Sequence, residues 1–188
     1  METDKKFAVV ANKNCVTYKE VFPLIKDNQI WSGREEWAGG MWFETKYDDI
    51  DKVIDGVNLK NVPSIWITNL EHGRRHQPLQ LMTMDDNLKF NKKLDGKNAY
   101  QEYDNYHAIE VPFTNAIPSD FDGVMGVPIS FLDKYNPEQF EIIASDYQLK
   151  DGSIPELLKS DWNGKTDRGY IDNQRMYSRL LIKHKKVA

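Results

Sequence analysis

A short polar segment gathers most of the side chains of this sequence that could bind an anion. It reads His72-Gly-Arg-Arg-His76 and follows an apolar run that ends at Thr68. Arginine contacts phosphate readily and can donate two hydrogen bonds to the edge of a guanine. The pattern therefore predicts that His72, Arg74, Arg75 and His76 contact DNA. Two alternatives stay open: a solvated basic turn, or an arginine that pairs with an internal carboxylate.

The two histidines of this segment also suggest a metal site, because they are four residues apart. On a helix, that spacing would place both imidazoles on one face. Gly73 and Pro78 favour a loop instead, and the sequence has no His-Glu-x-x-His pattern. We therefore expect no metal.

Polar residues also follow the first apolar run of the chain. Asn12, Lys13 and Asn14 come directly after it, and ligands of open α/β sheets bind at the carboxyl ends of the strands. We expect Lys13 to contact DNA, and Asn12 and Asn14 to line a pocket for a base. The alternative is a turn in which asparagine tolerates unusual backbone angles.

Trp42 and Phe43 are further candidates for a base pocket, because aromatic rings stack on bases. The commoner fate of such residues is burial in a core. No residue qualifies as catalytic. The single cysteine, Cys15, has no His or Asp dyad beside it, and the carboxylates match no glycosidase or metal-loop spacing.

Charge and composition limit the classes of protein that fit. The 188 residues carry 25 Lys and Arg against 29 Asp and Glu, a net charge of -4, which argues against strong independent DNA binding. One cysteine excludes an internal disulfide and suits the cytoplasm. No apolar run approaches the ~18 residues of a membrane span, and the first six residues lack the apolar part of a signal peptide.

The elements that would position these side chains begin with a strand and a helix. Lys5–Ala11 is apolar and β-branched, as in a buried strand, and Tyr18–Lys26 has helical periodicity. Together they predict a βα unit of a parallel sheet. Later strands are expected at Met41–Phe43, Ser64–Thr68, Ala108–Val111, Val127–Phe131, Phe140–Ala144 and Met176–His184. Leu79–Asn105 has no clear pattern, and no linker is apparent, so we expect a single domain over residues 1–188.

One long segment carries a family resemblance. Asp122-Gly-Val-Met-Gly-Val-Pro-Ile-Ser-Phe-Leu-Asp-Lys-Tyr-Asn-Pro-Glu-Gln-Phe-Glu-Ile-Ile-Ala144 resembles a run in the EcoRI-type adenine-specific DNA methyltransferases. Other segments are similar to that family in the same order: Ala11–Asn14, Thr17–Glu20, Gly40–Glu44, Thr68–Leu70, Arg74–His76 and Tyr177–Lys186.

The resemblance implies methyl transfer from S-adenosylmethionine to the exocyclic amine of an adenine that is first flipped out of duplex DNA. Such enzymes need a Gly-rich turn for the cofactor and an Asn/Asp-Pro-Pro-aromatic tetrad for the base. Neither motif is present, since the single Asn-Pro pair, Asn136-Pro137, is followed by Glu138-Gln139.

The resemblance therefore implies the C-terminal part of such an enzyme, contributing DNA contact and scaffold and inactive alone. The implied fold is α/β: a partial Rossmann-like methyltransferase sheet with a C-terminal α+β extension. S-adenosylmethionine would be bound by the complete enzyme and not by this chain alone. Double-stranded DNA would bind weakly, or only with a complementary N-terminal half. That half, or a second copy in a homodimer, would dock on an apolar edge around Phe7–Val10. The alternative is a non-catalytic accessory protein that binds DNA or protein.

Overall fold

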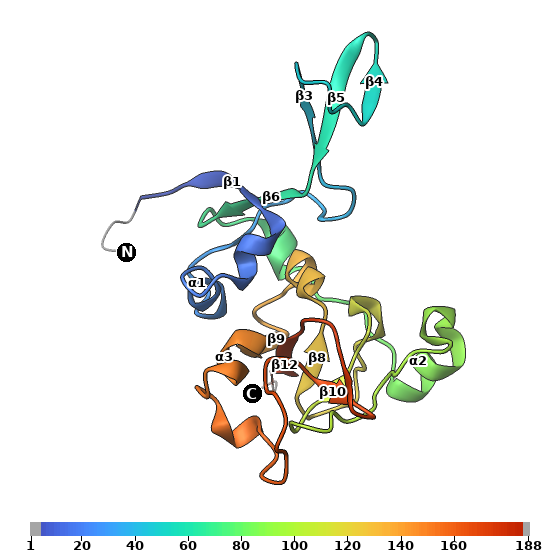
Figure 1. The fold of residues 1–188 in the computed structure, drawn as a ribbon. Coiled ribbons are helices and arrows are strands. Elements are labelled where there is room, and N and C mark those ends of the chain that lie inside the picture. Colours follow the sequence, from blue (N-terminus) through green and yellow to red (C-terminus); the bar gives the residue numbers. More distant parts are fainter. Residues whose placement is uncertain (1–4, 186–188) are drawn as a thin grey trace. The chain divides into compact units, whose positions relative to one another are not determined.

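The computed structural model describes residues 5–185, which form two compact units (Figure 1). The first unit ends at His72 and the second begins at Gly73. Lys186, part of the basic C-terminal segment of the resemblance, lies outside the described residues.

The first unit is built on a three-stranded sheet in the order β1-β6-β2. These strands are β1 (Ala8–Asn12), β6 (Ser64–Thr68) and β2 (Trp31–Ser32). Because β6 runs antiparallel to both neighbours, β1 and β2 run in the same direction. The strand and helix expected at the start of the chain are thus present. The sheet is not the parallel sheet that the sequence predicts, because the antiparallel strand β6 lies between β1 and β2.

The helix of this unit, α1 (Phe22–Lys26), is shorter than expected. A 3-10 helix at Lys13–Thr17 precedes it. Tyr18, the next residue, has an extended backbone (φ -71°, ψ 142°) that interrupts helical geometry. Pro23 stands in the first turn of α1, where its missing N–H costs nothing. The helix therefore begins only at Phe22.

A second sheet of the first unit is an antiparallel ribbon in the order β3-β5-β4 (Figure 1). Its strands are β3 (Met41–Glu44), β4 (Lys52–Ile54) and β5 (Val57–Val62). Asp55 and Gly56 join β4 to β5 with φ of 49° and 78°, as in a two-residue hairpin turn. No residue of the three strands is buried.

The second unit contains a four-stranded sheet in the order β7-β8-β12-β9. The strands are β7 (Ile109–Glu110), β8 (Met125–Val127), β9 (Phe140–Ser145) and β12 (Leu180–His184). β7 and β8 are parallel, and the other two pairs are antiparallel. This mixed sheet buries an apolar core that includes Met125, Val127, Phe140, Ile142, Leu180 and Ile182.

Smaller elements complete the second unit. They are α2 (Met84–Phe90), α3 (Asp146–Lys150), β10 (Tyr170–Ile171) and β11 (Gln174–Arg175). Short 3-10 helices cover Gly73–His76, Lys92–Leu94, Thr114–Ala116, Ile129–Lys134 and Pro155–Leu157.

Most of the expected strands are confirmed, with Ser64–Thr68 matching β6 at both ends. The extended segment expected at Val127–Phe131 is wrong. β8 ends at Val127, and a 3-10 helix begins at Ile129. Pro128 between them cannot donate a ladder hydrogen bond, so it ends the strand.

Candidate functional site

The predicted DNA-contacting arginines and His76 make internal contacts in the second unit. Arg74 Nη2 lies 2.8 Å from Asp133 Oδ1, and His76 Nδ1 lies 2.7 Å from Glu138 Oε1. Arg75 is buried. The alternative of pairing with an internal carboxylate is therefore realised for Arg74. These contacts leave DNA binding by Arg74, Arg75 and His76 a prediction.

His72 belongs to the first unit and occupies a polar position. Its Nε2 lies 2.9 Å from the carbonyl oxygen of Ser32, and its buried Nδ1 has no hydrogen-bond partner among residues 5–185. Over the same residues, no group of three or more His, Cys, Asp or Glu side chains is placed to hold a metal ion.

Burial raises the pKa of the Cys15 thiol, which disfavours its reactive thiolate form.

The residues at the end of β1 shape a turn. The Asn14 N–H donates to Asn12 Oδ1 over 2.9 Å, which caps the 3-10 helix that follows β1. Lys13 uses its backbone N–H to reach the Pro63 carbonyl at 2.9 Å, and its ammonium donates to the Trp37 carbonyl. Both asparagines remain exposed. Their role in a base pocket, like that of Lys13 on DNA, stays a prediction.

Trp42 and Phe43 lie on the ribbon, in β3, and are not part of a core. Their exposed fractions are 49% and 39%, so the alternative of core burial is wrong for both. Successive residues of a strand face opposite sides of a sheet, which means that one bound base can stack on only one of these rings. Lys52 Nζ lies 5.7 Å from the centre of the Trp42 ring.

Strand β6, at the centre of the β1-β6-β2 sheet, is buried along its whole length except at Trp66. Ile65 and Ile67 of β6 are buried, as are Phe22 and Ile25 of α1. Trp66, which points to the opposite side of β6, is only half-buried. It borders a cavity of about 360 Å³ lined by Ala8, Gly33, Arg34, Glu35, Trp66, Thr68, Leu70, Glu71 and His72. The cavity thus combines a large aromatic ring with charged side chains of both signs.

The outer edge of β1 is open and apolar. β1 is a terminal strand of its sheet, and no strand within residues 5–185 pairs with its outer edge. Val9 and Val10 of β1, whose side chains point to opposite faces of the sheet, are 47% and 44% exposed. This confirms the apolar edge that the sequence predicts in this region. Unpaired backbone groups along such an edge form a template for another strand.

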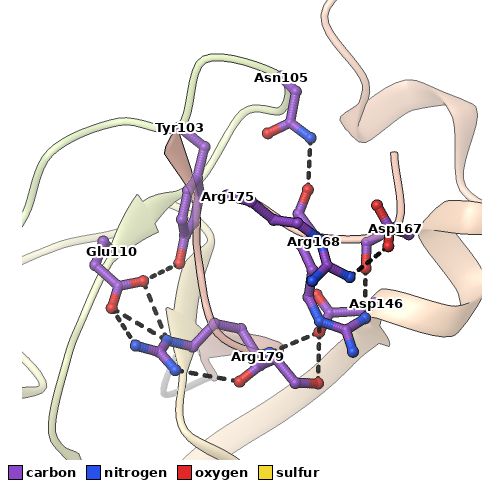
Figure 2. Close-up of polar contacts among 9 residues, drawn as sticks. Tyr103, Asn105, Glu110, Asp146, Asp167, Arg168, Arg175 and Arg179 are labelled. Atoms are coloured by element: carbon purple, nitrogen blue, oxygen red, sulfur yellow. Dashed lines mark hydrogen bonds and ion pairs between the residues drawn. The ribbon is translucent and has the colours of Figure 1, made fainter. Parts of the chain in front are cut away.

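A buried polar network in the second unit was not predicted from the sequence (Figure 2). Arg179 Nε donates to both carboxylate oxygens of Glu110 at 3.1 Å, and Tyr103 donates its hydroxyl proton to the same carboxylate. The backbone N–H of Arg179 donates to Asp146 Oδ2 at 2.7 Å, and Ser178 donates to the same oxygen at 2.6 Å. We call these five residues the Arg179 network.

The charges of the Arg179 network are shielded from water. Burial raises the pKa of Asp146, although hydrogen bonds from Ser178 and Arg179 oppose the shift. Burial also raises the pKa of Tyr103 well above its ordinary value. For Arg179, burial disfavours the guanidinium, but the hydrogen bonds and charge of Glu110 outweigh it and raise the pKa. The network is therefore a closed framework that ties β7 and α3 to the start of β12, and not an open site.

The comparisons with known proteins agree with the sequence resemblance. The model of the family "Adenine-specific methyltransferase EcoRI" matches residues 1–185. The type II methyltransferase M.EcoRI of Escherichia coli is 39% identical over 193 residues, covering 98% of this chain and 52% of the relative. The type II methyltransferase M.MpnI of Mycoplasma pneumoniae is 32% identical over 199 residues, covering 98% of this chain and 58% of the relative.

The chain thus spans about half the length of the curated relatives it matches. No solved structure matches it. Among the described residues, no helix is long and apolar enough to cross a membrane. Because the family model covers nearly the whole sequence, the chain belongs to the EcoRI family of adenine-specific methyltransferases.

Proposed function

We propose that this chain forms the C-terminal part of an S-adenosylmethionine-dependent, adenine-specific DNA methyltransferase. It supplies the later strands of a Rossmann-like sheet and an α+β extension that contacts DNA. The Gly-rich cofactor turn and the Asn-Pro-Pro-aromatic tetrad come from a complementary part. Alone, the chain neither binds the cofactor nor transfers methyl groups.

The open sheet of the first unit is the observation that carries this proposal. Sheets of the doubly wound class are covered on both faces, and a strand with an unpaired edge is a template for a further strand. Here β1 and β2 run in the same direction on either side of the antiparallel strand β6, and Trp66 of β6 borders a cavity. Val9 and Val10 leave the edge of β1 apolar. A complementary part with the earlier strands would pair with this edge and cover this face.

The match in length supports the same conclusion. The chain aligns over almost all of its own length with about half of each relative, and its 188 residues contain neither the cofactor turn nor the base-binding tetrad. The chemistry of the family would then reside in the part of the relatives that the match leaves out.

A calorimetric titration tests the cofactor claim. S-adenosylmethionine added to this chain should give no binding heat at micromolar concentrations, whereas full-length M.EcoRI serves as the positive control. Clear micromolar binding by this chain would show that it carries a cofactor site of its own.

An edge variant tests the docking claim. Val9→Lys places a charge on the edge of β1, which should abolish binding to the part of M.EcoRI outside the match, because a buried charge at a strand pair is costly. Val53→Lys is the matched control, since Val53 is also an exposed strand valine, on the ribbon. Equal binding by both variants in sedimentation velocity would place the docking surface elsewhere. Self-association of the wild type that Val9→Lys removes would assign the edge to a homodimer.

The second candidate, a non-catalytic accessory protein, is favoured by two observations. The net charge is -4, and Arg74 and His76 already pair with carboxylates of this chain, Asp133 and Glu138. Binding of DNA in a salt-dependent manner that an Arg74→Ala, Arg75→Ala double variant abolishes would support a direct DNA role for that loop. Absence of DNA binding by the wild type at low salt would favour a protein-binding role.

A further inference from the structure

A lysine-rich segment of the second unit has no role in the sites described above. Between Leu88 and Lys97, the end of α2, the following 3-10 helix and the turn after it expose four lysines: Lys89, Lys92, Lys93 and Lys97. Within residues 5–185, none of the four makes an ion pair. Other lysines of the chain, such as Lys159, do pair with a carboxylate. This segment therefore concentrates positive charge in a chain that is acidic as a whole.

The segment is held firmly by its inner side. Thr83 Oγ1 caps α2 by accepting the Asp86 N–H at 3.1 Å, and the buried Asn87 donates its amide to the Thr83 carbonyl at 3.1 Å. Leu94 is buried beneath the 3-10 helix. With these inner anchors, the lysines project from an ordered surface and not from a loose loop.

Two large apolar side chains accompany the lysines on the exposed side. Leu88 and Phe90 are 56% and 60% exposed, and Lys89 Nζ lies 4.9 Å from the centre of the Phe90 ring. The combination of cations and apolar side chains therefore indicates a partner that offers negative charge and flat apolar surface.

The carboxylates of this region leave the positive charge in excess. Asp85 and Asp86 form the first turn of α2, where they stabilise the helix dipole at the end opposite to Lys89. Within the segment itself, Asp95 is the single acidic residue against four lysines. The segment thus keeps a net positive charge.

Hydrogen bonds at Pro118 and Ser119 link the residues before α2 to the end of β12. His184 Nε2 lies 2.7 Å from the Pro118 carbonyl, and the Ser119 N–H donates to the Met82 carbonyl at 2.9 Å. These bonds attach the residues before α2 to the strand that carries Lys183. The backbone that leads into α2 is therefore anchored to the second unit.

We propose that the segment Leu88–Lys97 is a contact surface for the phosphate backbone of duplex DNA. Its lysines bind phosphates, and Phe90 and Leu88 contact the apolar faces of sugars or bases. The proposal rests on the proposed function, because DNA is the substrate of that function. An anionic membrane would also attract lysines, but two apolar side chains bury too little area for stable membrane anchoring.

Salt dependence gives a quantitative test. Each phosphate contact contributes about 0.9 to the slope of log K against log salt concentration for duplex DNA. A Lys89→Gln, Lys93→Gln double variant should therefore lower the slope by about 2. The control is Lys150→Gln, Lys165→Gln, which removes the same charge from two other exposed lysines of the second unit. Fluorescence anisotropy of a labelled duplex, measured from roughly 20 to 200 mM salt, gives both slopes.

Three outcomes would overturn the proposal. They are equal slopes for the two double variants, no binding of DNA at the lowest salt by the wild type either alone or mixed with the part of M.EcoRI outside the match, and a Lys89→Gln, Lys93→Gln variant that loses binding to anionic phospholipid vesicles while its DNA binding is unchanged. Circular dichroism verifies that each variant is folded. The cofactor titration and the edge variant do not involve these lysines. If the lysine variants fail this test while the cofactor titration and the edge variant give the expected results, the DNA-contact surface is wrong and the proposed function stands.

Discussion

Replacing Glu110 by glutamine should destabilise the second unit strongly. Glu110 and Arg179 are 1% and 7% exposed and are held in a two-pronged contact. The glutamine side chain would keep the volume and could still accept the Tyr103 hydroxyl, but the Arg179 guanidinium would lose its counter-charge. Breaking a buried pair from one side costs about 3–5 kcal/mol. For a chain of this size that corresponds to a fall in Tm of roughly 6–20 °C.

A surface pair provides the matched control. Glu102→Gln makes the same chemical change, but Glu102 is exposed and lies 2.9 Å from Lys159, so its loss should cost at most about 1 kcal/mol. Urea unfolding followed by far-UV circular dichroism gives both free energies of unfolding. If Glu110→Gln costs no more than Glu102→Gln, the guanidinium is not dependent on Glu110 and the account of the network is wrong. Adding Arg179→Met to Glu110→Gln should restore part of the loss, because the orphaned charge is removed.

Three further predictions concern single sites. Burial raises the pKa of Asp146 above its ordinary 3.8, so as the pH rises the unfolded chain loses this proton before the folded chain does, and the free energy of unfolding falls until the folded pKa is passed. Asp146→Asn should flatten that part of a plot of unfolding free energy against pH, and an unchanged plot would refute the assignment. Gly126→Ala should lower the free energy of unfolding by about 1–3 kcal/mol, because the new Cβ would lie 2.9 Å from Cε2 of the buried Tyr103 ring. Gly73→Ala is the control, since its Cβ meets no atom within 4 Å, and equal unfolding free energies for the two variants would contradict this close packing. Cys15 is buried with a raised pKa, so it should react with a thiol reagent only as fast as the protein opens; a rate that ignores added urea would contradict its burial.

Local elements could be predicted from the sequence where apolar periodicity and turn residues agree. β6 matches its expected bounds because Ser64–Thr68 is β-branched, aromatic and preceded by Pro63. The helix expected to begin at Tyr18 begins only at Phe22, because Pro23 favours the first turn of a helix. Apolar periodicity alone does not reveal where a helix begins. The expected extension past Val127 failed for the same kind of reason, at Pro128.

Long-range pairing was beyond sequence reasoning. The insertion of β6 between β1 and β2 joins segments that are far apart in the chain, and no local pattern encodes that order. Arg74 meets Asp133 across 59 residues, and Arg179 meets Glu110 across 69. The sequence singles out Arg74 as a candidate for DNA contact and does not single out Arg179, and only the folded chain reveals which carboxylate each arginine faces. The DNA-contact roles of the predicted site residues therefore stay predictions, and the sequence alone does not reveal their partners within the fold.

The most direct measurement is reconstitution of methyl transfer. This chain is mixed with the separately produced part of M.EcoRI that lies outside the match, and transfer of labelled methyl from S-adenosylmethionine to the adenine amine of duplex DNA is measured. The account predicts no transfer by either part alone and clear transfer by the mixture, lost when Val9→Lys replaces the wild-type chain and kept with Val53→Lys. Methyl transfer by this chain alone would contradict the account, as would an inactive mixture in which the two parts bind each other.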